Sequence, residues 1–368
     1  MAQTARNPKY VRIASKLEEK IHSGILAHGE RLPTERELCG QFGVASQTLR
    51  HALQLLSDQG LISREQGRGT FVSSPSPHAP KGKAGIQPVA LIGFGPSVSG
   101  WRDPANWEVH MRCYQGMVEA GFDCGFAIRS LDLPSGKRTL DDYLGVAANS
   151  SGILIHADSD HPPPATMLAA LRETGTPVVA IERHQYSVCS EARVDLRAGG
   201  RLAMEHLIGL GHRRIGLLTG KKNIWIEQRE IAYADALEAA GIERLPELIA
   251  ADPVGLPDDA AKVAHRMLSM AAPPTAIFAV NDLRALGVVA AASELGLRIP
   301  EDISVIVFDD IAPAGIAHPP LTTIRNPVYE LGREAVFLLK ALIASPTSDL
   351  RIRSLVPTLV IRESCGPV

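Results

Sequence analysis

The sequence predicts two folded parts: a small helical domain that ends in a β-hairpin, and a large α/β domain built on doubly wound parallel sheets. After residue 88, six short apolar runs alternate with amphipathic stretches, the pattern of strands that are covered by helices on both faces. These are about 280 residues, more than one such sheet usually holds, so we expect two lobes with a cleft between them. A proline-rich segment separates this part from the first 73 residues.

Composition favours a globular protein with an uneven charge. The 368 residues are 45% apolar and 21% charged, which suffices for large cores. Residues 1–85 contain 12 Lys and Arg against 7 Asp and Glu, whereas the remainder is acidic. A basic front part favours a polyanionic partner. The start of the chain has no apolar signal segment and no run approaches eighteen apolar residues, so we expect a cytoplasmic protein without a membrane partner.

The segment 74–88 is predicted to be a linker because Pro75, Pro77, Pro80 and Pro88 alternate with Gly, Ser and Lys. It divides the chain into a domain of residues 1–73 and a domain of residues 89–368. Prolines at this spacing interrupt any helix, so a helical connection between the domains is not expected. The five cysteines lack a paired spacing and are interpreted as reduced, mostly buried thiols. We predict no metal site and no cofactor.

The first domain reads as three helices followed by a hairpin. Apolar residues at helical spacing predict a helix between Tyr10 and Ile21. A second helix begins after Thr34, where Glu37 completes a capping box, and Gly43 provides the turn to a third helix that starts near Ser46. Residues 61–63 and 70–72 flank a glycine-containing turn and predict a β-hairpin. The result is a winged helix-turn-helix.

This part resembles the GntR family of bacterial regulators. The matching residues are Tyr10-x-x-Ile13, Gly29-x-x-Leu32-Pro33-Thr34-Glu35-Arg36-Glu37-Leu38, Thr48-Leu49-Arg50-x-Ala52-Leu53, Gly60-Leu61-Ile62 and Gly67-x-Gly69-Thr70-Phe71-Val72. The resemblance implies that this domain binds double-stranded DNA. The residues that it assigns to DNA contacts are Arg36, Ser46, Gln47, Thr48 and Arg50 near the third helix, and Gln66, Gly67 and Arg68 in the wing. One departure is Ala45-Ser46, where the family usually has Ser-Arg, so a cation is missing.

The second domain resembles the LacI-type effector domains, which are similar to periplasmic sugar-binding proteins. The matching residues include Val194-Asp195, His206-Leu207-Ile208-x-x-Gly211-His212-Arg213-Arg214-Ile215-Gly216, Arg229, Asn281-Asp282, Phe308-Asp309-Asp310 and Leu321-Thr322-Thr323-Ile324. Together the two resemblances imply a ligand-responsive regulator of the arabinose-repressor type.

Carried over by position, Arg229 and Asp309 are expected to anchor a small effector in the cleft. The other expected contacts are Asn281, Asp282, Glu182, Trp107 and Trp225, with Trp101 as a further candidate for an aromatic floor. A planar Arg and bidentate carboxylates suit the vicinal hydroxyls of a sugar. Many relatives have an aromatic residue after Asp252, where this chain has Pro253, so the stacking partner must lie elsewhere or the ligand is not a flat-faced sugar.

The resemblance implies a homodimeric repressor that leaves a pseudo-palindromic operator when a sugar-like effector binds. Two alternatives keep the architecture, namely an activator and a sensor of a nucleobase or organic acid. An enzyme is the rival class, and we expect none, because the chain has no HExxH, GxSxG, Walker A lysine motif or metal cluster. Gly93-Phe94-Gly95 follows a strand as a dinucleotide fingerprint would, but Val98 occupies the place of the third glycine.

Overall fold

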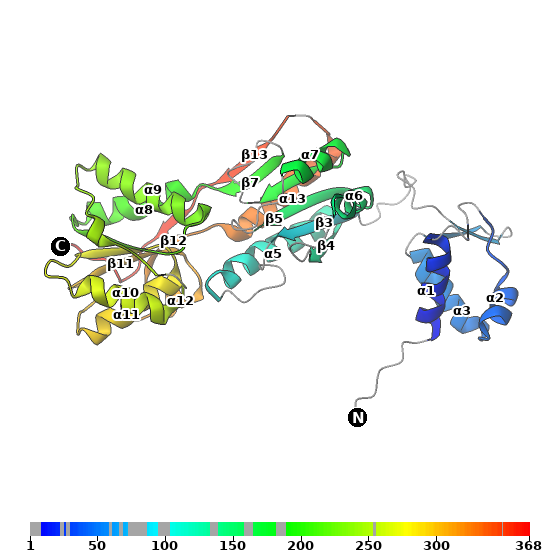
Figure 1. Cartoon of the computed structure of the whole chain (residues 1–368), viewed down its shortest axis with the longest axis horizontal. Helices are drawn as coiled ribbons and strands as arrows, with labels where there is room; N and C mark the ends of the chain where they lie inside the picture. The colour runs from blue at the N-terminus through cyan, green and yellow to red at the C-terminus, as the bar shows by residue number, and fades with distance from the viewer. Residues whose placement is uncertain are drawn as a thin grey trace, which may run out of the picture. The chain divides into compact units, whose positions relative to one another are not determined.

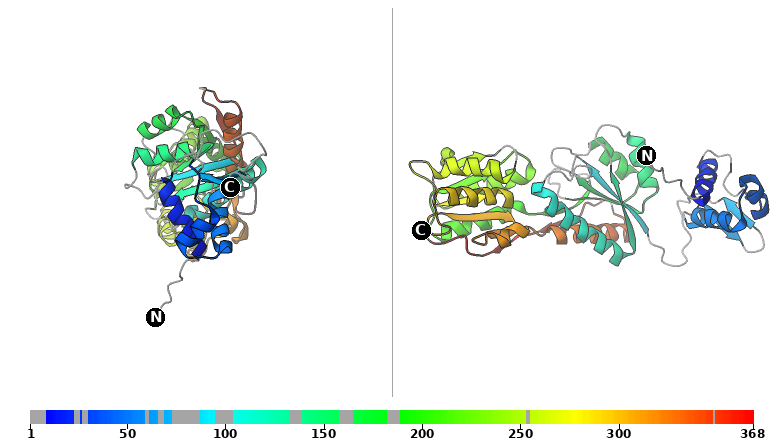
Figure 2. Two further views of the ribbon diagram at one scale, coloured as in Figure 1. Left: turned by 90° about the vertical axis from the view of Figure 1, so that its right-hand side faces the viewer. Right: turned by 90° about the horizontal axis from the view of Figure 1, so that it is seen from below.

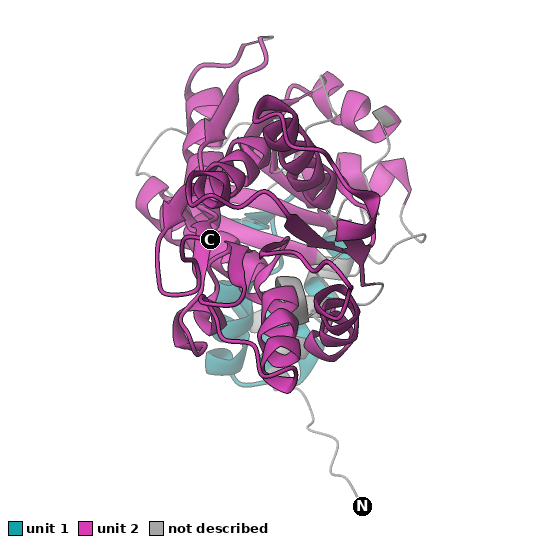
Figure 3. Ribbon diagram, turned by 90° about the vertical axis from the view of Figure 1, so that its left-hand side faces the viewer, with its two compact units in different colours: residues 1–83 teal, residues 84–368 magenta. Residues whose placement is uncertain are grey.

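The computed structural model divides the chain into two compact units, residues 1–83 and 84–368 (Figure 3). The described residues are 9–22, 26, 30–58, 61–65, 69–72, 87–94, 104–132, 139–157, 165–181, 189–252, 255–347 and 349–368. Of the predicted linker, only Gln87 and Pro88 lie among these residues, and they form the start of a strand rather than a linker.

The first unit is the predicted winged helix-turn-helix (Figure 1). Its elements are α1 (Lys9–His22), α2 (Glu35–Phe42), α3 (Ser46–Asp58), β1 (Ile62–Glu65) and β2 (Gly69–Val72). The helices bury one small core, in which Leu17, Leu38 and Leu49 are at most 2% exposed. Strands β1 and β2 pair antiparallel, as the wing requires.

Local signals set the boundaries of α2. Thr34 caps the helix, its hydroxyl accepts the Glu37 amide at 3.3 Å, and the Glu37 carboxylate accepts the Thr34 amide at 2.8 Å, so the capping box is confirmed. Gly43 ends the helix in the left-handed conformation with φ 61°. One pairing was not predicted: the Leu32 amide donates to Thr70 and the Val72 amide to Glu30, so residues 30–32 add a third extended segment to the wing.

The second unit contains two six-stranded sheets, which form two lobes (Figures 1 and 2). The order of the first sheet is β13-β7-β6-β5-β3-β4, and all its pairs are parallel. This N-terminal lobe consists of β3 (Gln87–Phe94), α5 (Pro104–Cys124), β4 (Phe126–Asp132), α6 (Leu140–Ala148), β5 (Gly152–Ala157), α7 (Ala165–Glu173), β6 (Val178–Ile181), β7 (Ser190–Val194), α13 (Val328–Ala344) and β13 (Ile352–Leu355).

The order of the second sheet is β14-β12-β11-β10-β8-β9, in which only β14 is antiparallel to its neighbour. This C-terminal lobe consists of α8 (Leu196–Gly209), β8 (Ile215–Thr219), α9 (Ile224–Ala239), η1 (Pro246–Leu248), β9 (Ile249–Ala251), α10 (Pro257–Leu268), β10 (Ala276–Ala279), α11 (Asp282–Glu294), β11 (Ser304–Asp309), α12 (Ala312–Ile316), β12 (Thr322–Arg325) and β14 (Thr358–Val360).

The chain passes between the lobes three times, after β7, after β12 and after β13. Helices cover both faces of each sheet (Figure 2), because the central strands are apolar on both sides: β6, β8 and β10 are buried at every position. The six strands predicted from apolar runs are confirmed. The two-lobed doubly wound architecture is confirmed with them.

Several predictions were wrong or incomplete. Helix α5 continues through Gly121 to Cys124, and Gly125 with φ 74° follows it. Strands β7, β12 and β13 were not foreseen, because their polar residues hide them in an apolar scan. The cysteines are free thiols, but only Cys113 and Cys189 are buried. Within the described part, no helix is long and apolar enough to span a bilayer.

Candidate functional site

The first candidate site is the start of α3, the second helix of the helix-turn-helix. Ser46 and Gln47 are exposed there, Arg50 is exposed one turn further, and Thr48 is half-buried. The Ala45 carbonyl accepts the amides of Thr48 at 3.0 Å and Leu49 at 3.2 Å, so the helix is well formed from its first turn despite the missing Ser-Arg pair. A polar, exposed first turn is what a major groove requires of a recognition helix.

Arg50 makes one contact in the absence of DNA. Its Nε donates to the Glu35 carboxylate at 2.9 Å, and the two side chains are 66% and 37% exposed. Such an exposed pair contributes at most about 1 kcal/mol, so a phosphate or base can replace Glu35 at little cost. Arg36 lies in the first turn of α2, but its side chain is outside the described residues, as are Gln66, Gly67 and Arg68 of the wing.

The second candidate site is the place where the two lobes of the large unit meet. Three contacts join α5 of the N-terminal lobe to the C-terminal lobe. The Glu108 carboxylate accepts the Ala312 amide at 3.1 Å, and Arg112 donates to the Asp310 carbonyl at 3.2 Å. The His110 ring lies edge-on to Trp225 of α9, with 6.2 Å between the centroids. The contacts from β11, α12 and α9 lie at the carboxyl end of the C-terminal sheet, where open α/β sheets bind ligands.

Arg229 and Asp309, the predicted anchors, come together here but bind each other. Arg229 Nη2 donates to Asp309 Oδ1 at 2.8 Å, and Arg229 Nη1 donates to the Val280 carbonyl. The guanidinium carbon lies 3.9 Å from the centroid of the Phe308 ring, a cation–π contact. Asn326 donates to the same Asp309 oxygen at 2.9 Å. Arg229 is 6% and Asp309 5% exposed, so the pair is buried within the C-terminal lobe.

Asn281 and Asp282 begin α11 at the end of β10. The Asn281 side chain caps the helix by accepting the Arg284 amide at 3.1 Å. Asp282 is 1% exposed and accepts the Ile311 amide at 3.3 Å. Burial raises the pKa of Asp282 well above its usual range, and the negative charge of Asp309 raises it further. This carboxyl group therefore favours its neutral form.

The aromatic candidates differ in position. Trp107 on α5 is 48% exposed, whereas Trp225 is half-buried against the core of the lobes. Glu182, Trp101 and Pro253 lie outside the described residues. Sequence reasoning missed two rings, His110 on α5 and His156 at the end of β5, whose centroids are 5.1 Å apart. The polar residue that closes the apolar run Gly152–Ala157 was the available signal for His156.

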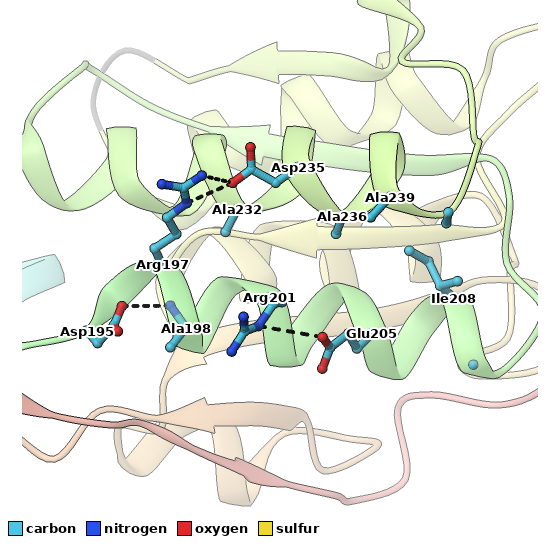
Figure 4. A pocket seen from close by; sticks show the side chains of 12 residues that line it. Asp195, Arg197, Ala198, Arg201, Glu205, Ile208, Ala232, Asp235, Ala236 and Ala239 are labelled. Atoms are coloured by element: carbon cyan, nitrogen blue, oxygen red, sulfur yellow. Dashed lines mark hydrogen bonds and ion pairs between the residues drawn. The ribbon is translucent and has the colours of Figure 1, made fainter.

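A separate cavity of about 650 Å³ lies between α8 and α9 (Figure 4). Alanines of α9 line it, and its two arginines are already paired, Arg197 with Asp235 at 2.5 Å and Arg201 with Glu205 at 3.5 Å. None of the predicted effector residues lines this cavity. Among the described residues, no group of His, Cys, Asp and Glu side chains is arranged to hold a metal ion.

Two family models match the chain. Residues 9–72 match the bacterial regulatory proteins of the gntR family, and residues 204–365 match the periplasmic binding protein-like domain. Among curated proteins, the chain is 27% identical to the arabinose metabolism transcriptional repressor of Geobacillus stearothermophilus, over 97% of both chains. It is 37% identical to the transcriptional repressor PurR of Haemophilus influenzae (strain PittEE), over 45% of this chain and 50% of that protein, so it aligns with about half of such relatives.

Solved structures with the same fold include regulators of the LacI family. A regulatory protein from Chloroflexus aggregans matches with a TM-score of 0.65 and 26% identity, over 76% of this chain and 98% of that one. A LacI family transcriptional regulator from Enterococcus faecium, solved with bound ribose, matches with a TM-score of 0.63 and 22% identity, over 77% and 100%.

A winged helix with a polar recognition face, joined to a two-lobed α/β domain, defines the class of transcription regulators that carry a separate effector domain. The chain combines a helix-turn-helix domain of the GntR type with a periplasmic-binding-protein-like domain of the LacI type. The relative that matches along almost the whole chain is a transcriptional repressor, and so is the PurR relative that matches about half of it.

Proposed function

We propose that this protein is a transcription repressor, and that a small carbohydrate-like effector releases it from its operator. The observation that carries the proposal is the combination of both sites on one chain: an exposed polar recognition helix in one unit and a two-lobed ligand-binding fold in the other. The relative that matches along almost the whole chain is named as a repressor of arabinose metabolism. A protein with this function catalyses no reaction and acts in the cytoplasm, where the DNA lies.

The DNA-binding surface consists of Arg36, Ser46, Gln47, Thr48 and Arg50, with Gln66, Gly67 and Arg68 in the wing. The front unit is basic, which favours binding to phosphates. A homodimer would place two such surfaces on a pseudo-palindromic operator, because a two-fold symmetric protein matches a two-fold symmetric site. The ribose bound by one structural neighbour and the arabinose in the name of the full-length relative support a sugar-like effector.

The effector site lies where the lobes meet, around Arg229, Asp282 and Asp309. Asn281, Glu182, Trp107 and Trp225 complete the proposed set. Ligand binding between the lobes favours their closed arrangement, because only in that arrangement do residues of the N-terminal lobe and residues of the C-terminal lobe contact the ligand together. Closure then alters the dimer and with it the separation of the two winged helices. Because Pro75, Pro77 and Pro80 disfavour a helix in the segment 74–88, we propose that this signal takes a route other than a helical linker.

The experiment that tests the proposal is operator binding by the Arg50→Ala variant of the full chain. DNA fragments from around the protein's own gene are titrated by fluorescence anisotropy at several salt concentrations. We expect operator affinity to fall about tenfold or more, since a hydrogen bond to a charged group is lost. The slope of log affinity against log salt should decrease by about one unit if the lost partner is a phosphate.

Arg298→Ala is the matched control. Arg298 is 70% exposed and pairs with one carboxylate, Asp302, at 2.9 Å, as Arg50 pairs with Glu35, but it lies in the other unit. This variant should bind the operator like the wild type. Equal operator affinity of the wild type and Arg50→Ala would refute the assignment of the recognition surface. A wild-type protein without sequence-selective DNA binding would refute the function itself.

A further inference from the structure

Three rings from three elements line the region where the lobes meet. His110 of α5 lies 5.1 Å from His156 of β5 and 6.2 Å from Trp225 of α9, measured between ring centroids. The first two belong to the N-terminal lobe and the third to the C-terminal lobe. A ligand held between the lobes therefore meets rings that carry nitrogen, and an indole nitrogen can only donate a hydrogen bond.

The Trp225 side chain carries an unmade hydrogen bond. Its Nε1 atom is buried, and no hydrogen-bond partner for it exists among the described residues. Arg229, one helical turn later on α9, also has a buried Nε atom without such a partner. Buried donors are almost always paired in native proteins, so two unpaired donors on one face of a helix can receive acceptors from a bound molecule.

The position of Trp225 on its helix favours a negatively charged acceptor. Asn223 caps α9, a helix of 16 residues, and Trp225 is the second residue after the cap. The amino end of a helix carries a partial positive charge and binds anions. In the same region, the Glu108 carboxylate of the N-terminal lobe accepts a hydrogen bond from the backbone amide of Ala312.

The carboxylates near these rings are already paired, which disfavours a neutral sugar. Asp309 accepts from Arg229 and Asn326, and Asp310 accepts from Arg325 at 2.8 Å and Arg362 at 2.6 Å. A neutral sugar needs unpaired acceptors for its hydroxyl protons. The described part of the region offers unpaired donors at Trp225 and Arg229. Two buried oxygens of the same region also have no partner among the described residues, Asp282 Oδ1 and Asn326 Oδ1, and burial raises the pKa of Asp282 well above its usual range.

We infer that the effector carries an oxyanion, either a carboxylate or a phosphate, and that Trp225 recognises this group through its indole N–H. His110 and His156 enclose the same group from the other lobe. This inference rests on the proposed function and specifies its effector as a sugar acid or a sugar phosphate. It makes Trp225 the residue that selects an acidic effector over its neutral parent.

The test uses the full-length protein and matched pairs of probes. Arabinonate and ribose 5-phosphate are compared with arabinose and ribose by thermal shift and then by calorimetry. We expect at least one acid to raise the Tm and its neutral parent at the same concentration to leave the Tm unchanged. The two acids distinguish a carboxylate from a phosphate. Trp225→Phe, which keeps a ring and removes the N–H, should weaken binding of that acid about tenfold or more.

Phe122→Leu is the control, because this α5 ring is 85% exposed and lies outside the proposed site. It should bind the acid like the wild type. The inference is overturned if neither acid raises the Tm, if a neutral parent binds as tightly as its acid, or if Trp225→Phe binds the acid unchanged. The comparison of acid with parent needs no variant, so it decides even if Trp225→Phe does not fold. Operator binding, measured separately, shows whether the proposed function survives.

Discussion

Single residues at the meeting point of the lobes combine structural and binding roles. Asp309 has a φ of 108°, which an L-amino acid adopts at a cost of about 1–3 kcal/mol. Its buried pair with Arg229 holds it there. Removing one partner of a buried ion pair typically costs about 3–5 kcal/mol, so a substitution at Arg229 or Asp309 changes stability before it reports on ligand binding. Variants such as Trp225→Phe are therefore the better probes of the cleft.

Asp282 gives a prediction about the pH dependence of stability. Its pKa is raised in the folded state by burial and by Asp309, so folding favours the protonated carboxyl. This contribution is fully present below the ordinary pKa of about 3.9 and is lost as the pH rises through the folded value. Asp282→Asn keeps an acceptor for the Ile311 amide and does not titrate. We expect the variant to gain stability over the wild type at pH 8 and to gain little at pH 4, measured by thermal unfolding.

Asp302→Asn is the control of opposite sign. Hydrogen bonds from Arg298 lower the pKa of Asp302 to about 2, so its contribution is present above the ordinary pKa and is lost as the pH falls. This exposed variant should be slightly less stable than the wild type at pH 8. If Asp282→Asn lowered the Tm equally at both pH values, the change in stability would not come from titration of Asp282, and the prediction of a raised pKa would be contradicted.

At the scale of elements, the N-terminal lobe depends on a close crossing of α5 and α13. A β-carbon on Gly332 would collide with the carbonyl oxygen of Cys113, and one on Gly116 would collide with that of Tyr329. Each glycine thus lets the backbone of the other helix approach. The crossing matters to the cleft, because α5 carries Glu108 and His110.

Gly332→Ala is predicted to lower the free energy of unfolding by about 1–3 kcal/mol, since the helices must separate to admit a methyl group. Gly145→Ala is the matched control: Gly145 lies in α6, and a β-carbon there meets nothing within 4 Å. That variant should be unchanged or more stable by about 0.5–1 kcal/mol, because alanine favours a helix. Urea unfolding of both proteins measures the difference. If both variants lost the same free energy of unfolding, the close crossing of α5 and α13 would not be the cause of the loss.

At the scale of the whole molecule, effector binding and DNA binding must influence each other equally. If the effector weakens operator binding by a certain factor, the operator weakens effector binding by the same factor, typically about 5- to 150-fold. Calorimetric titration of the protein with the effector, with and without saturating operator, measures this factor as the ratio of the two effector affinities. In Arg50→Ala, DNA added at a concentration that saturates the wild type but lies below the weakened Kd of the variant should change effector affinity much less. A factor of one in the wild type would contradict the proposed release mechanism.

The sequence alone determined the elements whose signals are local. Apolar runs defined the central strands, the Thr34–Glu37 box and Gly43 defined α2, and the resemblance located both predicted sites. The internal strand β12 and the edge strand β13 were missed, because polar residues interrupt the apolar pattern in both.

The tertiary structure decided how the cleft residues are used. Arg229 and Asp309 are 80 positions apart, and Trp225 and His110 are 115 apart, so no local pattern relates them. Only the folded structure shows that the expected anchors satisfy each other, that His110 of the other lobe lies beside Trp225, and that the Trp225 N–H has no partner among the described residues. Periodicity and capping act within a few residues, whereas pairing and burial in a cleft depend on segments that meet only after folding.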